Sequence, residues 1–369
     1  MRYSSIDILR TIAIVVMVLV HFAENLSGVH LPITGLGAPL FAFLSGLSYC
    51  LWVNGLEARG KSDEEISKRS IRRGLFVFAV GFFFNILVWL PEGTFNWDVL
   101  TFIGAAILLL NGLRRLPLPI PVLVAVLSIL VSPLLQGMAD YQAYWVEGYF
   151  ESDLTLSDVL IGFLATGYFP VFPWLAYSIA GLVTGKLMFS SSLDQDEKNE
   201  LTAERKTGWK SAMIGAALMA LSGFLLLVGP SLPEAIATRL LGGWHMFPAT
   251  IEYVLATIGM AMFLFGIGHQ IVDHSPTFAR HSGWLDIAKT FSRYSFTIYV
   301  LHHLVHVWPM WVYALAEGKE PTFYWQRAMH VTIALPLAIV FLVVCYFALR
   351  KIGPDRRLGI EGWMRWLCD

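Results

Sequence analysis

Charged residues are scarce in this 369-residue chain. Asp, Glu, Lys and Arg together make up 14% of it, against 56% for hydrophobic residues. The 26 basic and 27 acidic residues nearly cancel, giving a formal net charge of −1, and the basic ones are scattered along the sequence. A nucleic-acid-binding protein carries a concentrated basic surface instead. The composition therefore argues against a nucleic-acid partner and against an ordinary soluble domain.

Cysteine is also rare. Cys50, Cys345 and Cys368 are too widely spaced for a metal or redox motif, and an odd count leaves no complete disulfide framework. We expect free thiols. The first apolar segment is not followed by a small-residue cleavage site, so we expect it to be retained as the first helix rather than removed as a signal peptide.

Long apolar runs, by contrast, fill most of the chain, and its mean hydropathy is +0.61. A transmembrane helix needs roughly 17 to 25 mostly apolar residues, and about ten segments reach or approach this length. A half-span at 157–167 either enters the membrane without crossing it or adds an eleventh crossing. We predict an all-α, polytopic integral membrane bundle that forms one domain over 1–369. The predicted spans are 8–28, 34–54, 73–90, 98–113, 117–136, 169–189, 208–229, 248–271, 291–315 and 328–349.

The positions of the basic residues predict the orientation of these spans. Cytoplasmic loops of membrane proteins carry an excess of Lys and Arg. With both termini placed in the cytoplasm, all of the 26 basic residues except Arg239, Lys319 and Arg327 fall on the cytoplasmic side. One crossing too many or too few would scramble this asymmetry, so an even number of spans is favoured.

The first segment carries five polar or ionisable side chains, which together with Ile14, Met17 and Gly28 fall at spacings of three, four and seven residues. On a helix these spacings place the five on one face. Such groups are costly at membrane depth and by default indicate a functional site. Hydrogen bonding to a neighbouring helix is the structural alternative. The five residues are Asp7, Arg10, His21, Glu24 and Asn25.

Two histidines are the candidates for catalysis. His21 lies deep in the segment and can act as general base or accept an acyl group, with Glu24 and Asn25 one turn on to orient it or stabilise an oxyanion. His30 follows in a short outer turn that can bend back toward the same place. An ordinary loop histidine is the alternative for His30.

Basic residues on the cytoplasmic side form a candidate phosphate-binding rim. Guanidinium and ammonium groups there can receive the phosphates of a nucleotide-bearing donor, while positive-inside anchoring is the alternative. The Ser45 hydroxyl either lines a channel for that donor or packs between helices. The basic candidates are Arg10, Arg72, Arg73, Lys289 and Arg293.

Four further polar or aromatic residues are candidates for binding an acceptor substrate. Asp98 either lines the site or only caps a helix. Trp174 follows two prolines at a helix entry, and Glu252 is a second intramembrane carboxylate. His302 shares a helical face with His306, and such an H-x-x-x-H pair can hold zinc, but no third protein ligand is evident from the sequence. We therefore predict no metal.

Several stretches resemble one known family in order and spacing. They are SIDILRTIAIVVMVLVHF, GAPLFAFLSGLSYCL, GYFPVFPWLAYSIAGLVTGKL, and HMFPATIEYVLATIGMAMFLF followed by FSRYSFTIYVLHHLVH. The chain resembles the transmembrane acyltransferases that include heparan-α-glucosaminide N-acetyltransferase and its bacterial homologues. This resemblance spans most of the sequence.

The resemblance implies an acetyltransferase in the plasma membrane of a bacterium or archaeon. It implies transfer of an acetyl group from cytoplasmic acetyl-CoA across the bilayer to the nitrogen or oxygen of an acceptor. The identity of the acceptor does not carry over from the family, and we expect one such as an amino sugar or glycan. His21 matches the first-helix histidine of the wider acyltransferase group, whereas His30 is nearer the histidine of the glucosaminide branch. Whether the chain forms a homodimer is left open.

A transport function is the alternative to the enzyme. A proton-coupled secondary transporter or lipid-linked-sugar exporter also places ionisable residues inside the membrane, where they relay protons. His21, Glu24, Glu252 and His302 would then form the relay. The absence of an evident inverted repeat counts against this reading.

Overall fold

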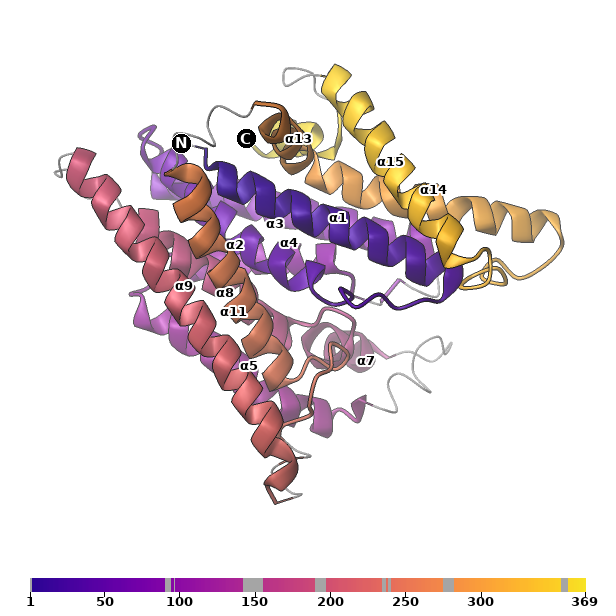
Figure 1. Ribbon diagram of the computed structural model, residues 1–369, viewed down its shortest axis with the longest axis horizontal. Helices are drawn as coiled ribbons and strands as arrows, with labels where there is room; N and C mark the ends of the chain where they lie inside the picture. The colour runs from indigo at the N-terminus through magenta and orange to yellow at the C-terminus, as the bar shows by residue number, and fades with distance from the viewer. Residues whose placement is uncertain are drawn as a thin grey trace. The chain divides into compact units, whose positions relative to one another are not determined.

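The protein is helical throughout the part that its computed structural model describes (Figure 1). Contacts divide the chain into two compact units. Unit 1 is formed mainly by Pro39–Ser275, and unit 2 by Tyr3–Ala38 together with Pro276–Leu367. The described residues are 2–89, 94–95, 97–141, 155–189, 197–233, 237, 240–274, 282–352 and 358–369, with side chains described outside the helical stretch 197–204.

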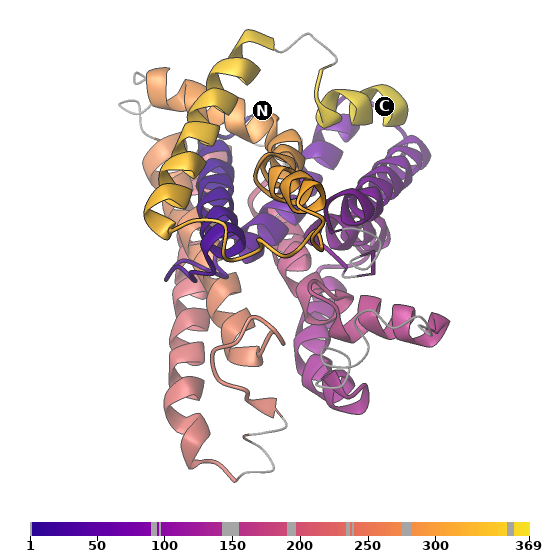
Figure 2. The same ribbon diagram turned by 90° about the vertical axis from the view of Figure 1, so that its right-hand side faces the viewer.

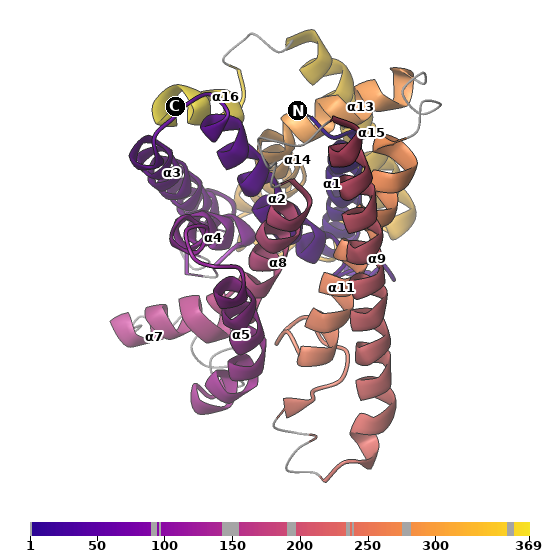
Figure 3. The same cartoon turned by 90° about the vertical axis from the view of Figure 1, so that its left-hand side faces the viewer.

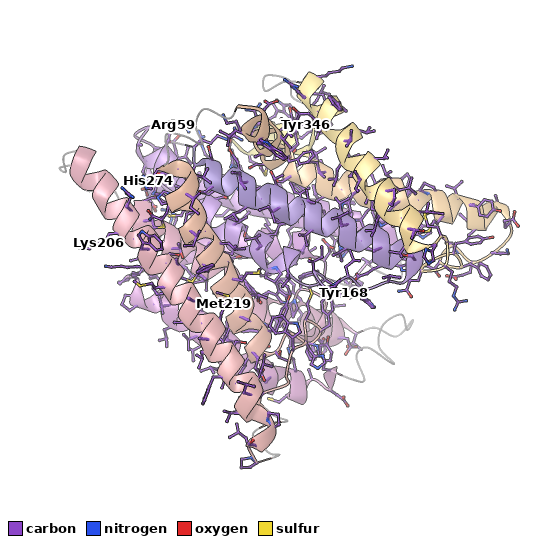
Figure 4. The ribbon with its side chains drawn as sticks, in the orientation of Figure 1. Arg59, Tyr168, Lys206, Met219, His274 and Tyr346 are labelled. Carbon is purple, nitrogen blue, oxygen red and sulfur yellow. The ribbon has the colours of Figure 1, made fainter. Side chains whose placement is uncertain are left out.

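Among the described residues, unit 1 consists of long helices, the six-residue helix α7 and three short helical turns. The pairs α3 and α4, α5 and α8, and α9 and α11 pack against each other, and α9 and α11 lie side by side in Figures 1 and 3. Lys206 on α9 and His274 beyond α11 lie at the same end of this pair (Figure 4). The elements are α2 (Gly37–Glu57), α3 (Asp63–Trp89), α4 (Val99–Leu113), α5 (Pro119–Met138), α7 (Leu156–Ile161), η2 (Gly162–Thr166), α8 (Val171–Phe189), α9 (Glu197–Val228), η3 (Gly229–Ser231), α11 (Ile251–Gly268) and η4 (His269–Asp273).

Small residues let α2 and α8 approach closely. A Cβ atom added to Gly46 would lie 1.8 Å from the backbone oxygen of Ser178, and one added to Gly181 would lie 2.0 Å from that of Phe43. Neither position has room for a side chain. Such close approaches at small residues are typical of helices that associate in lipid.

Basic residues gather at one end of α3, α4 and α8. Arg114 pairs with Asp63, and Arg115 Nη2 lies 2.8 Å from the second oxygen of the same carboxylate. Lys186 Nζ donates to the backbone oxygen of Arg114 at 2.6 Å. These three cations were all predicted to lie on the cytoplasmic side, and the fold of unit 1 brings them together.

Unit 2 is organised around α1, with two further long helices and two short amphipathic ones (Figure 2). Helix α14 runs in the same direction as α1. His21 contacts His302, and one turn further along both helices Asn25 contacts His306. Arg10, nearer the start of α1, bonds to Ser292 of α13, just before α14 begins. The elements are α1 (Ser4–Ser27), α13 (Ser282–Arg293), α14 (Ser295–Ala316), α15 (Val331–Ile352) and α16 (Ile360–Cys368).

Helix α15 returns in the opposite direction. At its start Met329 N donates to Leu26 O at the end of α1. Toward its other end the Tyr346 hydroxyl donates to Asp286 of α13 at 3.0 Å (Figure 4). Lys289 and Arg350 therefore lie at the opposite end of unit 2 from Arg327. The predicted topology requires this, because it places Lys289 and Arg350 on the cytoplasmic side and Arg327 on the opposite side of the membrane.

All ten predicted spans form helices. Eight helices of the described residues are long and apolar enough to cross a membrane. The other two predicted spans are α4, which has 15 residues, and α14, whose three histidines lower its hydropathy. The predicted half-span became α7 and the π-helical turn η2. The chain is thus an all-α polytopic membrane protein, while the single domain over 1–369 stays a prediction.

Candidate active site

The turn after α1 brings His30 back onto Glu24. Gly28 ends the helix in the left-handed region at φ 65°, which reverses the chain at low cost because glycine has no Cβ. His30 Nδ1 then lies 2.9 Å from Glu24 Oε1. The Thr34 hydroxyl donates to the same oxygen at 2.9 Å. The carboxylate of Glu24 is thus fixed by two donors from the turn.

This pair has the geometry of an oriented general base. A carboxylate only accepts, so His30 Nδ1 carries the hydrogen, and in the neutral ring Nε2 holds a lone pair. The His30 side chain is 77% exposed and that of Glu24 21%. An imidazole held by a carboxylate, with its other nitrogen accessible, can take a proton from an incoming nucleophile.

His21 has a different environment. It is half-buried, and its Nδ1 lies 2.8 Å from Nε2 of His302 on α14. Glu24 and Asn25 were expected to orient it. In the described contacts Glu24 instead bonds to His30, and Asn25 Nδ2 donates to His306 Nε2 at 2.9 Å.

Three histidines of α14 join His21 in a histidine cluster, defined as His21, His302, His303 and His306. The α14 members are 0%, 2% and 4% exposed. The His21 ring centroid lies 5.1 Å from that of His302 and 4.7 Å from that of His303. His303 was not predicted as a site residue, because helical spacing pairs His302 with His306 and turns His303 about 100° away. Here α1 packs close enough for His21 to meet both rings.

The candidate donor-binding residues fall into both units. In unit 2, Arg10 Nη1 donates to the Ser292 hydroxyl at 2.7 Å and so lies beside α13, the helix that carries Lys289 and Arg293. Lys289 is exposed. These three cations share one end of unit 2.

In unit 1, Arg72 and Arg73 lie on α3, and the Arg73 guanidinium is 4.3 Å from the centroid of the Trp52 ring. The Ser45 hydroxyl donates to Ala42 O at 2.7 Å and lies 3.3 Å from that of Ser178. These contacts correspond to the packing alternative that the sequence analysis gave for Ser45.

The three residues of unit 1 predicted to bind the acceptor differ in their hydrogen bonds and in their burial. Asp98 caps α4 by accepting from Leu100 N at 2.9 Å. Trp174 is fully buried against Tyr177 and other rings. Glu252, 1% exposed, accepts from Gly243 N at 3.0 Å through Oε1. Among the described residues its Oε2 is buried without a hydrogen-bond partner.

A comparison with known families decides the class of protein. The model of the catalytic domain of heparan-alpha-glucosaminide N-acetyltransferase matches residues 2–226, more than half of the chain. The chain belongs to this family. No curated protein matches it. Members of the heparan-alpha-glucosaminide N-acetyltransferase family are membrane acetyltransferases, and the apolar helices agree with that class. The matched region holds α1 and His30, whereas Glu252 and the α14 histidines lie beyond it.

Proposed function

We propose that the chain transfers an acetyl group from cytoplasmic acetyl-CoA to an amine or hydroxyl group of an amino-sugar or glycan acceptor, with His30 as general base. The hydrogen bond of 2.9 Å between His30 Nδ1 and Glu24 Oε1 carries this proposal. It leaves Nε2 of an exposed imidazole ready to accept a proton. Family membership favours this enzyme over the transporter or exporter that the sequence analysis kept as the alternative.

The proposed reaction is a direct transfer. His30 Nε2 takes the proton of the acceptor as its nitrogen or oxygen attacks the thioester carbonyl. The tetrahedral intermediate collapses with cleavage of the C–S bond, and the coenzyme A sulfur leaves with the proton that His30 returns. Glu24 stabilises the imidazolium between these steps, as a carboxylate does in a triad.

Arg10, Lys289 and Arg293 are the proposed binding site for the phosphates of acetyl-CoA. All three lie at the end of unit 2 that was predicted to be cytoplasmic, where this donor is available. Phosphate oxygens accept hydrogen bonds from Arg and Lys and balance their charge. The roles predicted for Arg72 and Arg73 of α3, which belong to unit 1, stay predictions.

In unit 1, taken by itself, Glu252 is a proposed binding residue for a polar group of a sugar. Its buried Oε2 lacks a partner among the described atoms, and an uncompensated carboxylate oxygen is costly. An ammonium or hydroxyl group of a sugar would satisfy it. Asp98 and His302 bond within the fold, whereas the Trp174 indole nitrogen is also buried without a partner among the described residues. The roles predicted for these three residues in substrate binding stay predictions.

The experiment that tests the base compares His30→Ala with His21→Ala in the purified full chain. Acetyl-CoA binding is measured by calorimetry, and release of coenzyme A is followed with glucosamine as acceptor. Loss of a general base lowers kcat by about 10²–10⁴-fold, and we expect this loss for His30→Ala with acetyl-CoA binding unchanged. Wild-type turnover by His30→Ala would refute the assignment, and absence of acetyl-CoA binding to the wild type would refute the donor.

A further inference from the structure

The histidine cluster between α1 and α14 takes no part in the mechanism proposed above. We propose that His21, His302 and His303 form a three-histidine site for zinc. One nitrogen of each ring lies within 4.8 Å of the others. The sequence paired His302 with His306 and showed no third ligand. The structure instead groups His302 with its neighbour His303 and with His21 of α1.

Hydrogen bonds orient the ligand atoms. His302 Nδ1 lies 3.2 Å from the backbone oxygen of Ile298. A carbonyl oxygen only accepts, so this nitrogen carries the hydrogen and Nε2 of the neutral ring holds the lone pair. That lone pair faces His21 Nδ1 at 2.8 Å. Histidines that bind metal ions usually donate their other N–H to a carbonyl or carboxylate in this way.

His303 is oriented in the same sense. Its Nδ1 lies 3.5 Å from the backbone oxygen of Tyr299, one turn earlier, at the outer limit of a hydrogen bond. Its ring centroid is 4.0 Å from that of His302 and 4.7 Å from that of His21. The backbone of α14 thus presents the Nε2 sides of two neighbouring rings to the one ring of α1.

The distances between the three histidine nitrogens need only small changes to fit a zinc ion. Zinc binds imidazole nitrogen at about 2.0–2.1 Å, which places two nitrogens of a tetrahedral site about 3.3 Å apart. His21 Nδ1 and His302 Nε2 would separate by about 0.5 Å from their hydrogen-bonded distance, and the widest pair would close by at most about 1.5 Å. Rotation of the three side chains suffices for shifts of this size.

The ligand set favours zinc over other divalent ions. Calcium and magnesium prefer oxygen ligands, and non-haem iron sites commonly include a carboxylate. Three imidazoles with one open position are a common zinc arrangement in enzymes. His306 is not the fourth ligand in this geometry, because its Nε2 already accepts from Asn25. The fourth position would hold water or a substrate oxygen.

The site is independent of the proposed acetyl transfer. It contains neither His30 nor Glu24, and two of its three ligands lie beyond the residues that match the family model. Zinc bound here would also link the last third of α1 to α14.

Metal analysis of the purified full chain in lipid nanodiscs tests the proposal. The protein is stripped with a chelator, and Zn²⁺ is titrated in competition with a chromophoric chelator. We expect about one zinc per chain, and a loss of affinity in His21→Ala, His302→Ala and His303→Ala that exceeds the 10–100-fold effect of outer-shell residues. His306→Ala, one turn along α14, and His330→Ala, in an exposed loop, are matched controls that should keep the affinity.

Cobalt provides a second measurement that needs no variant. Co²⁺ loaded into the wild-type chain should give the strong visible absorption of a tetrahedral site, and Zn²⁺ should abolish it. No zinc above the chelator background, or equal binding by all five variants, would overturn the proposal. So would a cobalt spectrum typical of octahedral coordination by water.

Discussion

At the scale of single residues, the position of Glu24 distinguishes the two histidine candidates. Its carboxylate accepts from His30 and Thr34, while His21 bonds to another histidine. A carboxylate stabilises an imidazolium far better than a neutral ring does. The polar face of α1 therefore divides into a more exposed pair, His30 with Glu24, at its C-terminal end and a more buried histidine cluster one turn earlier.

Glu24→Gln tests the carboxylate separately from the base. The amide oxygen can still accept from His30 and keep the ring in place, but the charge that stabilises the imidazolium is lost. We expect kcat to fall by about 10-fold or more, and less than in His30→Ala, with KM for acetyl-CoA unchanged. Steady-state kinetics measures this. An unchanged kcat would show that Glu24 is not part of the proton transfer.

At the scale of elements, the clearest constraint is the close crossing of α2 and α8. Gly46 and Gly181 lie where the two backbones meet, so that neither helix can carry a larger residue there. A second contact joins α16 to the start of α14. Glu361 accepts from Phe296 N at 2.7 Å and from Thr297 N at 3.0 Å.

Gly46→Ala should destabilise the protein, since the new Cβ would lie 1.8 Å from Ser178 O. Overpacking of this kind typically costs about 1–3 kcal/mol. Gly55→Ala in the same helix is the matched control, because its Cβ would have only the end of Arg59 nearby, at 3.8 Å. Thermal unfolding in detergent should show a clearly lower melting temperature for Gly46→Ala and an unchanged one for Gly55→Ala. Equal melting temperatures would contradict the close crossing.

Glu361 should make stability depend on pH. Burial raises the pKa of this carboxyl above its usual value of 4.5. The folded chain therefore binds the proton more tightly than the unfolded chain. The resulting stabilisation is present at low pH and is lost as the pH rises from about 4.5 through the raised pKa.

The measurement for Glu361 is the melting temperature between pH 4 and pH 8 for wild type and Glu361→Gln. The wild type should lose stability relative to the variant as the pH rises, because Gln carries no titrating proton. Parallel curves would contradict the raised pKa.

At the scale of the whole molecule, the two ends of unit 2 differ in charge. Arg10, Lys289, Arg293 and Arg350 gather at one end, and Lys319 and Arg327 lie in the loop at the other. This agrees with the cytoplasmic placement of both termini that was predicted from the basic residues. Orientation in the membrane itself is a prediction that labelling can test.

Single cysteines provide that test. The native Cys50, Cys345 and Cys368 are buried and free, as the sequence analysis expected, so their background labelling should be low. In intact cells a membrane-impermeant maleimide should label Lys319→Cys and not Lys351→Cys, whereas both should react after the cells are opened. Labelling of Lys351→Cys but not of Lys319→Cys in intact cells would contradict the cytoplasmic placement of the termini.

The sequence by itself determined the helices, because an apolar run of membrane length can satisfy its backbone in lipid only as a helix. It also identified His21, Glu24 and Asn25 as unusual, since polar groups are costly in such a run, and His30 as a candidate in the turn that follows. It could not assign their partners. Only the tertiary structure joined His30 to Glu24 and His21 to His302 and His303, because those contacts depend on how the chain turns at Gly28 and on the register of α1 against α14.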